Sequence, residues 1–97
     1  MPVPSEAELV EKVERLLVLP GRVPPEHAGP FARTVLAYFR GREEVVDAKL
    51  ASEDRGRFYA LEDVGVLSCS EEEVHLGKGR RWRVHYWSFA PNGHRPP

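Results

Sequence analysis

At 97 residues and a formal net charge of −1, the chain has room for one domain, residues 1–97, around one hydrophobic core. Its 41% apolar and 30% charged residues exclude a disordered polymer, and no apolar run reaches the roughly 20 residues of a membrane-spanning helix. A single cysteine, Cys69, excludes an internal disulfide framework. We therefore expect a cytoplasmic protein without membrane contact.

The basic residues are concentrated towards the end of the chain. Residues 1–48 carry six basic and eight acidic side chains, whereas the segment after Glu73 carries five basic side chains and no acidic ones. Nucleic-acid-binding domains are usually basic, because neutralisation of phosphates supplies much of their affinity. The distribution of charge therefore favours such a partner more than the net charge does.

The spacing predicts a first helix over residues 5–18. Ser5 and Glu8 form a capping-box pattern, and Pro20-Gly21 ends the helix. Its apolar residues form one stripe: Leu9, Val10, Val13, Leu16 and Leu17. This stripe either packs on its own domain or pairs with the same helix of a second subunit. The 4-and-3 spacing of Leu9, Val13 and Leu16 favours a homodimer through these residues.

Three more helices are expected after a loop at residues 22–29. Pro30 suits the first turn of a second helix, which ends at Gly41 and carries the apolar residues Phe31, Val35, Leu36 and Phe39. A short third helix is predicted over residues 43–51, from the acidic start and from Val45, Val46 and Leu50. Ser52 caps a fourth helix over residues 53–64, which Gly65 closes.

A β-hairpin is expected next. The strands are predicted at residues 67–76 and 82–89, around a glycine-rich basic turn at residues 77–80. The acidic run Glu71-Glu72-Glu73 predicts a bulge or kink in the first strand. Residues 90–97, rich in proline and polar residues, are predicted to be a frayed tail.

The order of these elements over residues 31–89 resembles the winged-helix superfamily. Two segments carry the resemblance: Phe58-Tyr59-Ala60-Leu61-Glu62-Asp63-Val64-Gly65-Val66-Leu67 and Gly79-Arg80-Arg81-Trp82-Arg83-Val84-His85-Tyr86-Trp87. The second is similar to a group of small archaeal winged-helix proteins of unknown function, whose last strand carries Trp-Arg-aliphatic-His-Tyr-Trp. The resemblance implies an α+β fold: a trihelical core and a two-stranded β-wing at residues 30–89, with residues 5–18 as an additional N-terminal helix.

This fold implies a DNA-binding protein that regulates transcription, with the wing on the DNA backbone. The predicted DNA contacts are Arg55, Arg57 and Tyr59 on the fourth helix and Lys78, Arg80, Arg81 and Arg83 in the wing. The other interpretation of the wing charges is a solvated hairpin whose edge is protected against strand pairing.

A protein–protein interaction module is the alternative function. The fourth helix has an acidic outer face, where a recognition helix normally exposes basic or amide side chains; the face consists of Glu53, Gly56, Tyr59, Ala60 and Asp63. Arg55 and Arg57 flank that face on opposite sides. Base readout by this helix is therefore weakly supported, and an acidic surface suits a protein partner.

The aromatic strand offers a further choice between core and interface. Trp82, Tyr86 and Trp87 could stack on unpaired bases, or could fill the core. Because Trp82 and Trp87 are an odd number of positions apart, an unbroken strand places them on opposite faces. One indole is then expected in the core and the other on the surface.

Metal and enzyme sites are not indicated. Cys69, His75 and His85 lack the paired spacing of a structural zinc site, and we expect neither a metal nor a cofactor. Ser68, Ser70 and Ser88 lack a nucleophile elbow, and no glycine-rich phosphate loop precedes a helix. The sequence therefore predicts a protein that is not an enzyme.

Overall fold

The computed structural model describes residues 3–90, which form an α+β fold with a three-stranded antiparallel sheet. The α-helices and strands are α1 (Glu6–Val13), α2 (Ala28–Tyr38), β1 (Val45–Val46), α3 (Ser52–Asp63), β2 (Leu67–His75) and β3 (Arg81–Phe89). Three shorter helical segments are η1 (Glu14–Val18, a π-helix) and the 3₁₀ turns η2 (Pro25–His27) and η3 (Asp47–Lys49).

The first predicted helix is confirmed: α1 and η1 follow each other without a break and form one continuous helical segment over residues 6–18. The amide N–H of Glu8 donates to the Ser5 hydroxyl at 3.2 Å, and the Ser5 N–H donates to the Glu8 carboxylate at 2.8 Å, which completes the capping box. The helix widens in its last turn, where the N–H of Leu19 reaches the carbonyl of Glu14 at 2.9 Å.

The second helix begins earlier and ends earlier than predicted. Residues 25–27 form η2 within the predicted loop, and α2 starts at Ala28, so that Pro30 still lies in its first turn. Ala28 is buried, which gives these earlier residues a packing reason to be helical. The helix ends at Tyr38, and Gly41 follows in the left-handed region with a φ of 73°.

The predicted third helix at residues 43–51 is wrong. Val45 and Val46 form β1, which pairs with Trp87 and Tyr86 of β3, and only the 3₁₀ turn η3 follows. β-branched residues suit a strand, and pairing with β3 buries the Val45 side chain. The apolar pattern alone did not distinguish this strand from a helix.

The fourth predicted helix is present as α3, but Ser52 does not cap it. Ala51 occupies the N-cap position, and no side-chain cap is formed. Gly65 closes the helix as predicted, with a φ of 79°. The N–H of Val66 donates to the carbonyl of Leu61 at 2.9 Å and that of Gly65 to Glu62 at 3.0 Å, the two hydrogen bonds of a Schellman motif.

The hairpin is confirmed, but the predicted bulge at Glu71-Glu72-Glu73 is not present. The register is unbroken from the pair Leu67–Phe89 to the pair His75–Arg81. A regular ladder keeps the glutamates on alternating faces, so that Glu71 and Glu73 reach Arg83 and Arg81 of β3 and Glu72 lies opposite Val84, without a kink. The sheet order is β1-β3-β2, so the predicted two-stranded wing gains a third, two-residue strand at its base.

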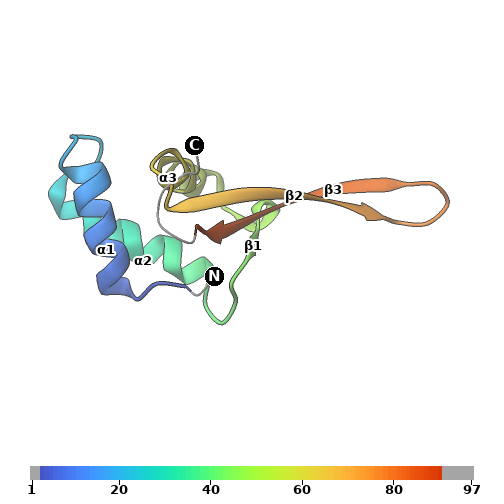
Figure 1. Cartoon of the computed structure of the whole chain (residues 1–97), viewed down its shortest axis with the longest axis horizontal. Helices are drawn as coiled ribbons and strands as arrows, with labels where there is room; N and C mark the ends of the chain where they lie inside the picture. Colours follow the sequence, from blue (N-terminus) through green and yellow to red (C-terminus); the bar gives the residue numbers. More distant parts are fainter. Residues whose placement is uncertain (1–2, 91–97) are drawn as a thin grey trace.

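The core lies between the helices and the base of the sheet. Aromatic rings join these parts: Phe58 of α3 lies 5.4 Å from the Trp87 ring, and Phe39 lies 4.7 Å from Phe89. The distal half of the hairpin extends away from the helices (Figure 1), which gives principal extents of 51 × 30 × 24 Å. The core and the projecting hairpin are therefore separate parts of the molecule.

Ala90 belongs to the predicted tail, but its N–H donates to the carbonyl of Val66 at 2.9 Å; the other tail residues lie outside the described range. Within residues 3–90, no helix has the length and apolar content needed to cross a bilayer.

Candidate nucleic-acid interface

The tip of the hairpin is a tight turn that places cations at the far end of the molecule. Gly77, Lys78 and Gly79 all have positive φ angles, 81°, 52° and 74°. Glycine adopts this region without strain, so the two glycines let the chain reverse around Lys78. The Leu76 N–H donates to the Arg80 carbonyl and the Arg80 N–H to the Gly77 carbonyl, both at 2.9 Å.

One face of the hairpin is charged and largely compensates its own charges. This ladder face consists of Glu71, Glu73, His75, Arg81, Arg83 and His85. Arg83 lies 3.2 Å from the Glu71 carboxylate, and Arg81 lies 3.4 Å from Glu73. His85 lies 3.9 Å from Glu71. The predicted contacts Arg81 and Arg83 are thus exposed but paired, whereas Lys78 and Arg80 have no ion-pair partner among residues 3–90.

The opposite face of the distal hairpin is apolar. We call Val74, Leu76, Trp82 and Val84 the apolar hairpin face; Glu72, opposite Val84, borders it on the side away from the tip. Val74 pairs directly with Trp82, and the Leu76–Arg80 hydrogen bond continues the same register, so Arg80 shares this face. The side chains of Trp82 and Leu76 are 60% and 55% exposed. Trp87 is only 1% exposed, which confirms that one indole is core and the other is at the surface.

Tyr86 marks the boundary between the apolar hairpin face and the base of the sheet. It pairs with Ser70 and is half-buried. Partial burial, followed by the negative charges of Glu72 and Glu44, raises the pKa of the Tyr86 hydroxyl. Tyr86 is therefore neutral at physiological pH, and Glu72 and Glu44 make its surroundings acidic.

Arg55, one of the predicted DNA contacts on α3, is held by its own chain. Its guanidinium pairs with the Asp47 carboxylate at 2.5 Å and donates to the Asp47 carbonyl at 3.2 Å. Burial opposes ionisation of Asp47, but hydrogen bonds from Trp87 and Arg55 outweigh it and lower the pKa of Asp47. The same ion pair raises the pKa of Arg55. Arg55 is a structural cation in this arrangement.

Arg57 is also engaged within the chain, whereas Tyr59 is exposed. Arg57 lies 2.9 Å from the Asp54 carboxylate, and the Tyr38 hydroxyl donates to Asp54 at 2.6 Å. These bonds explain why an acidic residue stands near the core edge. Tyr59 is 49% exposed, although its ring lies 5.7 Å from Trp87. The structure does not bring Arg57 or Arg55 together with the hairpin cations.

The predicted dimer residues lie inside their own subunit. Leu9 and Val13 are fully buried in the core, and Leu16 is half-buried against it. The apolar stripe of α1 therefore packs on its own domain, the other possibility that the sequence left open. A homodimer stays a prediction, and it would need a surface other than Leu9 and Val13.

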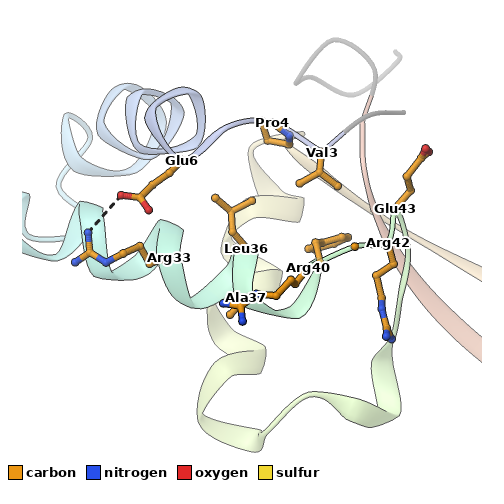
Figure 2. Close-up of a pocket in the computed structure, with 11 residues that line it drawn as sticks. Val3, Pro4, Glu6, Arg33, Leu36, Ala37, Arg40, Arg42 and Glu43 are labelled. Carbon is orange, nitrogen blue, oxygen red and sulfur yellow. Dashed lines mark ion pairs between the residues drawn. The ribbon is translucent and has the colours of Figure 1, made fainter.

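A second feature with exposed cations is an open pocket of about 680 Å³ between the N-terminal segment and the end of α2. Leu36 and Ala37 supply apolar lining, and the arginines at its border are Arg33, Arg40 and Arg42. Figure 2 shows Arg33 directed towards Glu6, at 3.6 Å, while Arg42 lies at the other side of the view. The guanidinium groups do not converge, so the pocket is not a formed anion site.

The possible metal ligands Cys69, His75 and His85 do not form a metal centre. Within residues 3–90, no group of three or more histidine, cysteine or acidic side chains lies close enough to hold an ion. Cys69 pairs with Trp87 in the sheet and is a partly buried thiol, whose pKa is raised by burial. A raised pKa leaves the thiol protonated and weakly reactive.

Two parts of the interface were missed from the sequence. The ion pairs of Glu71 and Glu73 with Arg83 and Arg81 were not predicted from the sequence. Val74 and Leu76 were not recognised as exposed neighbours of Trp82. Extending the ladder outwards from the turn between Gly77 and Gly79 would have found both, because it places position 74 opposite 82 and 73 opposite 83.

Comparison with known proteins identifies the family. The chain belongs to a family of unknown function, DUF6015, whose model matches residues 3–94. No curated protein and no solved structure matches the chain significantly.

Proposed function

We propose that this chain is a winged-helix protein that binds DNA through the β2–β3 hairpin, acting as the wing, and that regulates transcription by doing so. The element order α2, β1, η3, α3, β2, β3 and the sheet order β1-β3-β2 are compatible with a winged-helix-like layout. In this interpretation, the 3₁₀ turn η3 stands where the trihelical core has its middle helix. This arrangement supports the assignment of the projecting hairpin as a wing.

The observation that carries the proposal is the pair of cations at the hairpin tip. Lys78 and Arg80 have no ion-pair partner among the described residues, and the β2–β3 turn that carries them projects away from the helices (Figure 1). Residues 1–70 carry nine basic and twelve acidic side chains, whereas residues 71–89 carry four basic and three acidic ones. A polyanion that approaches this molecule is attracted to residues 71–89 and repelled by residues 1–70.

The proposed contact is with the phosphate backbone rather than with base edges. Arg55 and Arg57 are held by Asp47 and Asp54, and the exposed face of α3 is acidic. Phosphate contacts position a protein on the duplex without reading its sequence. We therefore expect binding that varies little between duplex sequences, with α3 lying beside the DNA and contributing little affinity.

The test is a salt-titrated binding assay of the intact protein on mixed genomic duplex DNA. Two to four phosphate contacts predict that log affinity falls with log salt with a slope of about −2 to −4. Binding of this slope on unrelated sequences supports the proposal. No salt-sensitive binding at low ionic strength would contradict it.

A second candidate is a winged-helix protein–protein interaction module that does not bind DNA. The acidic outer face of α3 favours it, because Glu53 and Asp63 are exposed on either side of the exposed Tyr59. Such a face suits a basic protein surface. A Glu53→Lys/Asp63→Lys variant separates the candidates: it strengthens DNA binding under the first proposal and abolishes capture of a protein partner under the second.

A further inference from the structure

We infer that the apolar hairpin face binds single-stranded nucleic acid, with the Trp82 indole stacked on an unpaired base. The inference rests on the proposed function, since it assigns a ligand class to the same hairpin. Its starting point is an exposed indole on a projecting ribbon. Trp82 is 60% exposed and Leu76 is 55% exposed, and the distal hairpin extends beyond the helices (Figure 1).

This exposure is not needed to build the fold. The core already holds the other indole, Trp87, together with Phe58, Phe39 and Phe89. Trp82 faces away from the ladder face; its neighbours on its own side of the sheet are Val74, Val84 and Leu76, and Glu72 lies opposite Val84 on the side away from the tip. An exposed indole among aliphatic side chains offers a flat platform to a ligand.

The charges around this platform indicate an anionic ligand. Arg80 shares the face through its pairing with Leu76, and Lys78 is at the apex of the turn. Between residues 74 and 84 there is no acidic residue. Glu71 and Glu73 lie on the ladder face, where they pair with Arg83 and Arg81; Glu72 shares the face of Trp82 but lies opposite Val84, on the side away from the tip cations. The ligand must therefore combine a flat apolar group with a nearby negative charge, which is the chemistry of a nucleotide.

Single strands fit this face better than a duplex or a second copy of the chain. In a duplex the bases are stacked on each other, so an indole cannot cover one without unstacking it. Stable protein interfaces use about 20–30 residues on each side, whereas this face offers Trp82 and a few neighbours. A short run of nucleotides needs only a stacking platform and cations for its phosphates.

The test uses the fluorescence of Trp82 with a thymidine oligonucleotide of about 12 nucleotides, within the range of single-strand sites. The matched probes are an abasic strand of the same length and a duplex. We expect the thymidine strand to quench the emission and the abasic strand to bind more weakly without quenching. Trp82→Ala is expected to weaken thymidine binding at least about fivefold and to leave duplex binding within about twofold. Trp82→Phe retains only the Trp87 emission, which is expected not to respond.

The outcomes separate this inference from the proposed function. If the duplex binds with salt sensitivity but Trp82→Ala loses nothing on the thymidine strand, the inference fails alone. If neither nucleic acid binds, both fail. A quenching or blue shift of the emission with anionic vesicles, and not with the oligonucleotide, would overturn the inference in favour of a membrane. A mass above that of the monomer that Trp82→Ala abolishes would overturn it in favour of a second copy of the chain. Circular dichroism confirms that each variant is folded.

Discussion

The indole Nε1 of Trp87 donates a hydrogen bond of 2.9 Å to Oδ1 of Asp47, 40 residues earlier in the chain. The same carboxylate pairs with Arg55 of α3. A single side chain in η3 thus joins the central strand of the sheet to the helix beside it. This arrangement explains why residues 43–51 leave the helical conformation, since a strand at Val45 and Val46 carries Asp47 to the indole.

Removal of the Asp47 carboxylate is expected to destabilise the fold. Asp47→Ala leaves the Trp87 N–H and the Arg55 guanidinium without their acceptor, at a cost of about 1–3 kcal/mol in the free energy of unfolding. Urea denaturation measures this cost. Asp63→Ala is the matched control, because Asp63 pairs with Arg22 at the surface and its loss is expected to cost less than about 1 kcal/mol. Equal costs would contradict a joining role for Asp47.

The stability contributed by Asp47 is expected to depend on pH. Burial alone would raise the pKa of Asp47, but the hydrogen bonds from Trp87 and Arg55 lower this pKa in the folded state. The stabilisation is therefore complete above the unfolded pKa, near 3.8, and is lost as pH falls through the lower folded pKa. The difference in unfolding free energy between the wild type and Asp47→Asn measures it. A difference that stays constant from neutral pH into strong acid would refute this linkage.

The α1 stripe is expected to respond as a core and not as a dimer interface. Leu9 is fully buried, so Leu9→Ala is predicted to cost about 2–5 kcal/mol of stability. Leu19, which is 80% exposed, provides the control: Leu19→Ala is expected to change little. Denaturation is followed together with light scattering. A drop in mass of Leu9→Glu/Leu16→Glu before any unfolding would restore the predicted α1 dimer.

Neutralising the ladder-face glutamates is expected to strengthen DNA binding. Glu71→Gln/Glu73→Gln frees Arg83 and Arg81 for phosphates, so the salt slope is predicted to steepen by up to about 2 units. Surface ion pairs contribute little to stability, so the fold is expected to persist. The charge-matched control is Glu11→Gln/Glu14→Gln on the N-terminal helical segment. A gain of the same size in the control would show that net charge alone, not the hairpin, sets the affinity.

The sequence predicts elements well where the signal is local. The capping box at Ser5 and Glu8 predicted α1, and Gly65 predicted the end of α3, because each is a short-range hydrogen-bonding motif. Parity along an unbroken strand placed Trp82 and Trp87 on opposite faces. These expectations needed only the geometry of neighbouring residues.

The remaining features depend on residues that are distant in sequence. Val45 and Val46 form a strand because β3 pairs with them, and the sequence around them does not encode that partner. The engagement of Arg55 by Asp47 and of Arg57 by Asp54 likewise follows from the three-dimensional structure. The two ion pairs remove Arg55 and Arg57, two of the predicted DNA-binding cations, from the candidate site. Lys78 and Arg80 keep that role in our proposal because they lie at the hairpin tip, away from the helices.

The central claim is that the hairpin tip holds the nucleic-acid backbone, and the salt dependence of duplex binding by Lys78→Ala/Arg80→Ala tests it most directly. The matched control is Arg40→Ala/Arg42→Ala, which removes two exposed cations from the border of the α2 pocket. We predict that the hairpin variant weakens binding on all sequences and flattens the slope by about 2 units, while the pocket variant leaves the slope unchanged. Unchanged binding by the hairpin variant, or an equal loss in the pocket variant, would contradict the claim.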